Sequence, residues 1–90
     1  MKVRSMKVKV LYFAGLREQL GSPGEDLELS AAVSTVAGLR THLMARGGAW
    51  QSALAQGRAL RVAVNQEMAQ PTTPVKPGDE VAFFPPVTGG

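Results

Sequence analysis

The stretch GDEVAFFPPVTGG, residues 78–90, joins a strand pattern to a signal that ends the strand. Side chains in residues 80–84 alternate, which predicts a short strand with Val81 and Phe83 facing a core. The prolines at residues 85–86 have no amide hydrogen to donate, so the sheet must end at the residue before them. We therefore predict that the chain leaves the sheet there as a stiff, extended arm.

This arm, residues 85–90, ends in the dipeptide Gly89-Gly90. Fully extended, it would reach roughly 20 Å from the last paired residue, which is far enough to enter the active site of another protein. Glycine has no Cβ, so the backbone near the end of the chain can pass through a narrow channel and turn freely at the reacting carbon. We therefore predict that the arm is the working part of the protein and that the Gly90 carboxylate is the group that reacts.

The hydrophobic periods upstream predict a small α+β domain in which one main helix covers one face of a mixed sheet. Alternating segments predict strands over residues 6–13, 26–30, 60–64, 67–68 and 80–84. Helical spacing predicts a short helix over residues 16–20, a main helix from an N-cap in residues 34–35 to about Arg46, and a helical turn over residues 49–54. The chain is thus expected to divide into a disordered extension over residues 1–5, a domain over residues 6–84 and the arm over residues 85–90.

Alternation also assigns the two faces of the sheet. One side of the first strand carries two lysines, so the other side is the better core face, with Val8, Val10 and Tyr12. The outer face then presents Leu11 and Phe13, and the same parity in the last strand places Phe84 there. We therefore expect an apolar group on the face that the main helix does not cover.

Composition limits what the chain can do. Ninety residues, 44% of them hydrophobic, suit one soluble domain, and the lack of cysteine excludes disulfides and thiolate chemistry on this chain. With a single histidine, His42, no convincing metal site or Ser-His-Asp arrangement can be assembled. The net charge of +3 is dispersed, and neither a membrane-spanning run nor a signal-peptide core is evident. We expect no nucleic acid or membrane partner, a cytoplasmic location, no bound cofactor, and no catalysis by the chain alone.

Four segments resemble the small, sulfur-carrying subunits of molybdopterin synthases. They are VKVLYFAGLRE at residues 8–18, Thr35-Val36 with Leu39-Arg40, AVNQ at residues 63–66, and GDEVAFFPPVTGG at residues 78–90. The resemblance covers nearly the whole chain from Met6, and the final segment is its most specific part. It implies a ubiquitin-like β-grasp fold, which is consistent with the element order predicted above.

The resemblance also implies a reaction cycle. An ATP-using activating enzyme would adenylate the Gly90 carboxylate, and a sulfur donor protein would convert it to a thiocarboxylate. The arm would then enter the large synthase subunit and supply the dithiolene sulfurs of molybdopterin to a cyclic pyranopterin phosphate, in a heterotetramer of two small and two large subunits. By the same resemblance, the large subunit would bind an outer-face patch that includes Leu11, Phe13 and Phe84. Its active site would receive Pro85, Pro86, Val87, Thr88 and Gly89.

Three alternatives remain open at this point. The chain could carry sulfur for another pathway, such as thiamine, cysteine or tRNA thiolation, because similar folds there also end in Gly-Gly. It could be a ubiquitin-like modifier whose Gly90 is joined to lysines of target proteins. It could also be a plain binding module that uses Phe13 and Phe84 and does not use the carboxylate.

Overall fold

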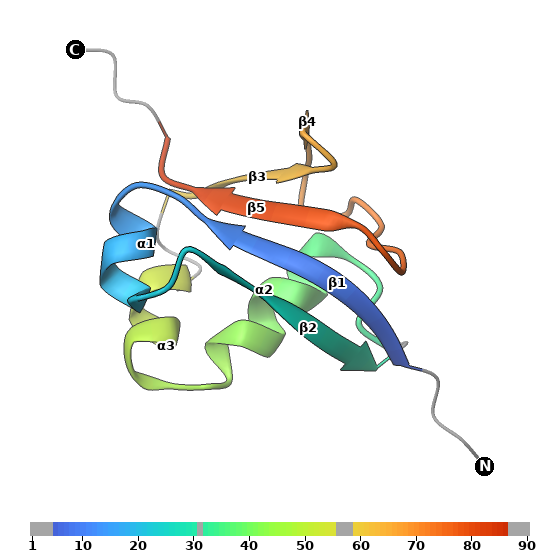
Figure 1. Cartoon of the computed structure of the whole chain (residues 1–90), viewed down its shortest axis with the longest axis horizontal. Helices are drawn as coiled ribbons and strands as arrows, with labels where there is room; N and C mark the ends of the chain where they lie inside the picture. The colour runs from blue at the N-terminus through green and yellow to red at the C-terminus, as the bar shows by residue number, and fades with distance from the viewer. Residues whose placement is uncertain (1–4, 31, 56–58, 87–90) are drawn as a thin grey trace.

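Five strands form one mixed sheet in the computed structural model, which describes residues 5–30, 32–55 and 59–86. They are β1 (Ser5–Tyr12), β2 (Gly24–Ser30), β3 (Arg61–Val64), β4 (Glu67–Met68) and β5 (Glu80–Phe84), in the spatial order β2-β1-β5-β3-β4. The central pair β1 and β5 is parallel and the other neighbouring strands are antiparallel (Figure 1). The predicted α+β class and mixed sheet are confirmed, and the arrangement is that of a ubiquitin-like β-grasp domain.

The helices lie on one side of this sheet, behind it in Figure 1. They are α1 (Gly15–Leu20), α2 (Val36–Met44) and α3 (Gly48–Leu54). The main helix α2 ends at Met44, slightly earlier than expected, because Gly47 and Gly48 both adopt positive φ and redirect the chain into α3. Each predicted helix is therefore present, with boundaries that differ by one or two residues.

Four strand boundaries also differ from the prediction. β1 ends at Tyr12 rather than Phe13, and β2 begins at Gly24 rather than Asp26. Ser5, expected in the disordered extension, is the first residue of β1 and pairs with Ser30. Leu60, expected to open the third strand, precedes β3 and is only partly buried. Residues 1–4 of the expected extension lie outside the described part of the chain.

The core lies between the sheet and the helices. The inward side chains of the strands are buried as predicted: Val8, Val10, Tyr12, Leu27, Leu29, Val62, Val64, Val81 and Phe83. They pack against the apolar stripe of α2, formed by Val36, Leu39 and Leu43, and against Ala53 and Leu54 of α3. Burial of these side chains removes apolar surface from water, which is the main force that holds the helices to the sheet.

The start of α2 is fixed by a side chain and by a distant loop. The Thr35 hydroxyl accepts a hydrogen bond from the Gly38 amide at 3.1 Å, as expected of an N-cap. The amides of Val36 and Ala37 donate to carbonyl oxygens in the loop before β5, those of Thr73 at 3.0 Å and Pro71 at 2.9 Å. The loop therefore pairs amides that a helix leaves unsatisfied in its first turn.

Gly24 marks a close approach between β2 and β1. A Cβ added there would lie 2.6 Å from the Val10 carbonyl oxygen and 2.9 Å from a Leu11 methyl carbon. Because the oxygen belongs to the backbone, the strands would have to separate, and we expect Gly24→Ala to destabilise the domain by about 1–3 kcal/mol. The measurement is urea unfolding at neutral pH.

Gly15 supplies the control. A Cβ at Gly15 meets nothing within 4 Å, and the residue is at the start of α1, where alanine is the better helix former. We expect Gly15→Ala to be neutral or slightly stabilising. Equal stability of the Gly24→Ala and Gly15→Ala proteins would contradict the close approach.

Candidate functional site

The register of the five strands arranges the outer face of the sheet in rows of side chains. Residues directly opposite on neighbouring strands lie on the same face, so each row can be followed across the sheet. One row crosses all five strands and holds only apolar residues and a glycine, namely Met68, Ala63, Ala82, Leu11 and Gly24. The next row toward the end of β5 contains Arg61 and Phe84. Phe13 follows β1 beside it, with its amide donating to the Phe83 carbonyl oxygen at 3.1 Å.

These rows form a continuous apolar surface, here called the outer patch and defined by Leu11, Phe13, Ala63, Met68, Ala82, Phe84 and Pro85. Most of these residues line a shallow hollow of about 610 Å³ on the face opposite the helices. Phe13 is 47% exposed and Met68 is 61% exposed, which is unusual for side chains of this size. A contiguous exposed apolar surface of this kind is typical of a protein-binding site.

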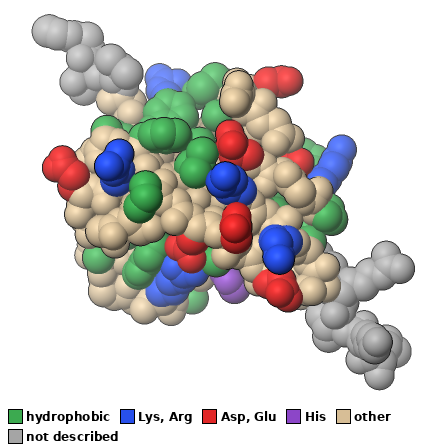
Figure 2. Space-filling view, viewed as in Figure 1, with side chains coloured by type: hydrophobic (Ala, Val, Ile, Leu, Met, Phe, Trp, Pro, Cys, Tyr) green, Lys and Arg blue, Asp and Glu red, His purple; other side chains and the backbone are tan. Residues whose placement is uncertain are grey.

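The other half of the outer face is charged. Lys9 lies in register between Asp26 of β2 and Glu80 of β5, and Lys7 lies opposite Glu28. Figure 2 shows the result, a line of alternating red and blue side chains beside a region of green ones. Because cations and anions alternate, this half offers no field of one sign and no apolar surface. This half therefore lacks the exposed apolar surface that makes the outer patch a candidate docking site.

The base of the arm adjoins the outer patch. β5 ends at Phe84, whose side chain belongs to the patch, and Pro85 lines the same hollow. Neither Pro85 nor Pro86 belongs to a strand, as expected of residues that cannot donate to a ladder. The remaining arm residues with predicted roles, Val87, Thr88, Gly89 and Gly90, lie outside the described residues.

The predicted interface residues are thus brought together. Leu11, Phe13 and Phe84 all lie on the outer face, and none of them belongs to the buried core. Their role in binding a partner stays a prediction. Sequence reasoning missed Met68 and Arg61 as members or neighbours of the same surface, because their position depends on pairing between strands that alternation does not specify.

A polar cluster braces the strand that leads to Phe13. The Tyr12 hydroxyl donates to Glu25 Oε2 at 3.0 Å, and both terminal nitrogens of Arg46 donate to the same carboxylate at 2.8 Å. The Arg46 guanidinium also lies 4.4 Å from the centre of the Trp50 ring, which packs edge-on against Tyr12 with 5.3 Å between ring centres. Trp50 thus packs against the core, and the cluster ties β1 and β2 to the helices.

The cluster perturbs the titration of its members. The hydrogen bonds from Arg46 hold the pKa of Glu25 below its ordinary value, and the same contact raises the pKa of Arg46. Burial raises the pKa of the Tyr12 hydroxyl, and the nearby Glu25 carboxylate raises it further. At neutral pH the arrangement is therefore a carboxylate held by a cation and a neutral phenol.

Glu25 should make folding stability depend on pH. Its pKa is lower in the folded chain than in the unfolded one, so the ionised group stabilises the fold above about pH 4.5, and this contribution is lost as the pH falls through the lowered folded pKa. We expect Glu25→Gln to cost about 1 kcal/mol at pH 7, since solvent screens a partly exposed pair, and progressively less in acid. The check is urea unfolding of both proteins from pH 7 to pH 3. Glu28→Gln, on the same strand, is the control, and an equal pH dependence of all three proteins would contradict this assignment.

Other features of the described chain do not suggest a catalytic centre. Within the residues that the structure describes, no three His, Cys, Asp or Glu side chains are grouped to hold a metal ion, and no helix is long and apolar enough to cross a membrane.

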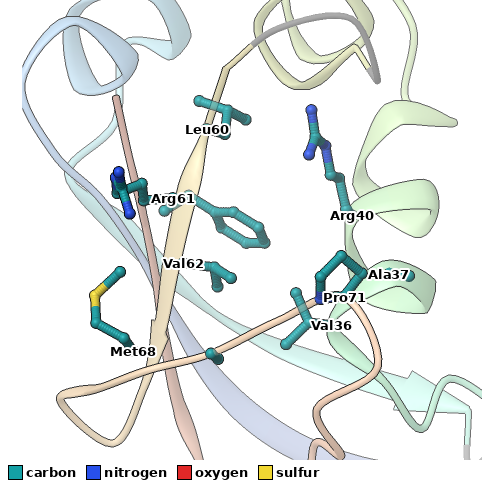
Figure 3. Close-up of a pocket in the computed structure, with 10 residues that line it drawn as sticks. Val36, Ala37, Arg40, Leu60, Arg61, Val62, Met68 and Pro71 are labelled. Carbon is teal, nitrogen blue, oxygen red and sulfur yellow. The ribbon is translucent and has the colours of Figure 1, made fainter. Parts of the chain in front are cut away.

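A hollow of about 160 Å³ lies between α2 and β3 (Figure 3). At its rim, Arg40 Nε donates to the Leu54 carbonyl oxygen at 2.6 Å and its guanidinium also donates to that of Ala55. Arg40 thus joins α2 to the end of α3.

Comparisons with known proteins show that the chain is similar to sulfur carrier subunits of molybdopterin synthases and to small archaeal modifier proteins. The model of the ThiS family matches residues 10–90. The molybdopterin synthase sulfur carrier subunit of Escherichia coli (strain K12) is 47% identical over 83 residues, which cover 92% of this chain and 99% of that protein. Small archaeal modifier protein 1 of Haloferax volcanii superposes with a TM-score of 0.75 at 26% identity, covering 91% of this chain and 99% of the other. A chain in the complex of subunits 1 and 2 of molybdopterin-converting factor from Helicobacter pylori 26695 gives 0.61 at 27% identity, covering 94% and 100%.

Proposed function

The chain belongs to the ThiS family, and we propose that it is the sulfur carrier subunit of a molybdopterin synthase. The match to the family extends to residue 90, so it includes the terminal Gly89-Gly90. The chain also spans nearly the full length of the Escherichia coli carrier, with almost half of the aligned residues identical. A similarity of this extent supports a shared role for the whole chain.

The observation that carries the proposal is the position of the base of the arm, Pro85, relative to the outer patch. Phe84 lies in the patch, and the next residue, Pro85, starts the arm and lines the same hollow. A protein that docks on the patch is therefore held beside the arm, and it needs only a channel that starts there to receive the end of the chain. This geometry suits a carrier, whose own surface binds the partner while its terminus enters the partner's active site.

The chemistry of the arm follows from the low reactivity of a carboxylate. The Gly90 carboxylate oxygen attacks the α-phosphorus of ATP on an activating enzyme, which releases pyrophosphate and leaves an acyl adenylate. Sulfur at the oxidation level of sulfide, delivered by a donor protein, then attacks the acyl carbon, the bond from that carbon to AMP breaks, and a C-terminal thiocarboxylate remains. Activation splits one difficult substitution into two easier ones, and ATP is held by the activating enzyme rather than by this chain. The chain needs no cysteine, because the carried sulfur resides on its terminal carbonyl carbon.

The large synthase subunit is the partner that receives the loaded arm. The structural neighbour from Helicobacter pylori, which is in a complex of two subunits of molybdopterin-converting factor, supports this partner. In the large subunit of the proposed synthase, the thiocarboxylate supplies the dithiolene sulfurs to a cyclic pyranopterin phosphate. This synthase is an assembly of two small and two large subunits. The proposal places the cycle in the cytoplasm, where ATP is available for the activation step.

The mass of the native protein tests the proposal. We expect protein isolated from its own host to include a form in which one oxygen of the terminal carboxylate is replaced by sulfur. Intact-mass spectrometry detects the change, and fragmentation places it on Gly90. Unmodified protein throughout, from cells that are actively making molybdopterin, would count against a carrier role.

A protein modifier is the second candidate, because small archaeal modifier protein 1 has the same fold over nearly its whole length. A modifier forms an amide bond between Gly90 and a lysine of a target, so it appears as a ladder of larger conjugates on a denaturing gel. A carrier gains only the mass of sulfur in place of oxygen. Immunoblots of host extracts made under denaturing conditions therefore separate the two functions.

A further inference from the structure

Among the described residues, Arg61 is the cation of the outer face that lacks a carboxylate in register. The two lysines of that face each have an acidic residue opposite on a neighbouring strand, whereas Arg61 has Phe84. The Arg61 side chain is exposed, and within the described residues it forms no hydrogen bond or ion pair. Its charge is therefore not compensated by the sheet that carries it.

The surroundings leave the guanidinium accessible at the rim of the outer patch. β4 pairs only with Ala63 and Val64, so this short edge strand does not extend over Arg61. Figure 3 shows the Arg61 side chain on the opposite side of β3 from Arg40, at the edge of the hollow between α2 and β3. Arg61 thus faces outward beside Phe84, close to the start of the arm.

A partner that covers Phe84 must also take water from Arg61. Removing water from an unpaired cation costs free energy, whereas a carboxylate placed against the guanidinium offsets that cost with two parallel hydrogen bonds. Arginine has only donors, so a neutral apolar surface cannot replace the lost water. The interface therefore favours a partner with an acidic group at this point.

We propose that Arg61 is a specificity determinant of the docking surface and pairs with a carboxylate that the large subunit presents beside the site that receives Phe84. The inference rests on the proposed function, since it takes the large subunit to be the protein that covers the patch. Arg61 acts in recognition and has no role in the sulfur chemistry. It selects a large subunit with an acidic residue at that position over one with a basic or apolar residue.

The test compares dissociation constants for the large subunit of the same host, measured by calorimetry with the full-length chain. We expect Arg61→Gln to weaken binding about tenfold and Arg61→Glu to weaken it further, with a reduced dependence of binding on salt. Arg61→Lys should recover part of the loss, because a lysine keeps the charge but not the paired hydrogen bonds. The matched control is Lys9→Gln, which removes a charge from the other half of the face and should change the constant by less than about twofold.

A charge exchange identifies the carboxylate. Acidic residues of the large subunit are replaced by arginine one at a time, and one of them should restore binding to the Arg61→Glu chain. If Arg61→Gln and Arg61→Glu bind like the wild type while Phe84→Ala binds weakly, this inference is overturned and the proposed function stands. If the wild-type chain does not bind the large subunit, or Phe84→Ala binds it as tightly, docking through the patch fails, and the inference fails with it.

Discussion

Deletion of Gly90 is expected to abolish sulfur transfer while the folded domain remains intact. The deletion shortens the arm by one residue, about 3.5 Å. The carboxylate of the new terminus therefore does not reach the active site of the activating enzyme or that of the synthase. No described strand or helix extends beyond Phe84, so the loss should change folding stability by less than about 0.5 kcal/mol. The measurement is molybdopterin formation by purified large subunit, activating enzyme and sulfur donor with either chain.

Two further measurements show whether the loss of sulfur transfer comes from the missing Gly90 rather than from a change in the domain. The melting temperature and the affinity for the large subunit should both match those of the full chain, which shows that the loss is chemical and not structural. Glu28→Gln, on the charged half of the outer face, is the activity control and should support normal product formation. Sustained molybdopterin formation by the shortened chain would refute the assignment of the reacting group to Gly90.

Phe84→Ala is expected to weaken binding of the large subunit by about 1–3 kcal/mol, which is five- to more than a hundredfold in dissociation constant. Phe84 lies in the outer patch at the last residue of β5, so we expect it to serve both as an apolar anchor and as the residue that positions the start of the arm. Truncation to alanine removes the anchor and leaves a cavity at the interface. Calorimetric titration of the large subunit measures the change.

Leu20 provides a matched control for Phe84. It is also partly buried, but it packs against the core from α1 on the other side of the sheet. Leu20→Ala should lower the melting temperature and leave the dissociation constant unchanged, whereas Phe84→Ala should do mainly the opposite. An unchanged dissociation constant with a lowered melting temperature for Phe84→Ala would show that this side chain serves folding rather than docking.

The faces of the strands could be predicted from the sequence because alternation is a local property. Each residue of an extended chain points to the opposite side from its neighbours, so placing Val10 in the core is enough to place Leu11 outside. The same reasoning assigned Phe84 to the outer face. Two prolines after β5 were sufficient to predict where the sheet ends.

The composition of the outer patch could not be predicted in this way. Met68 and Leu11 belong to one row only because β4, β3, β5 and β1 are neighbours in a particular register. That register is set by contacts between segments that are far apart in the chain, through the shared core and the cost of closing the loops between them. The same strand register explains why Arg61 lies beside Phe84, whereas Lys9 lies between two carboxylates.

By itself, the sequence determined the class of the fold, the faces of its strands and helices, and a slender terminus suited to carry a reactive group. These features depend on chemistry within a few residues, such as side-chain alternation, missing amide hydrogens and missing Cβ atoms. Only the tertiary structure decided which side chains surround the base of that terminus and which charge among them lacks a counterpart. Neighbours across a sheet are chosen by the packing of the whole chain, and no short segment contains that information.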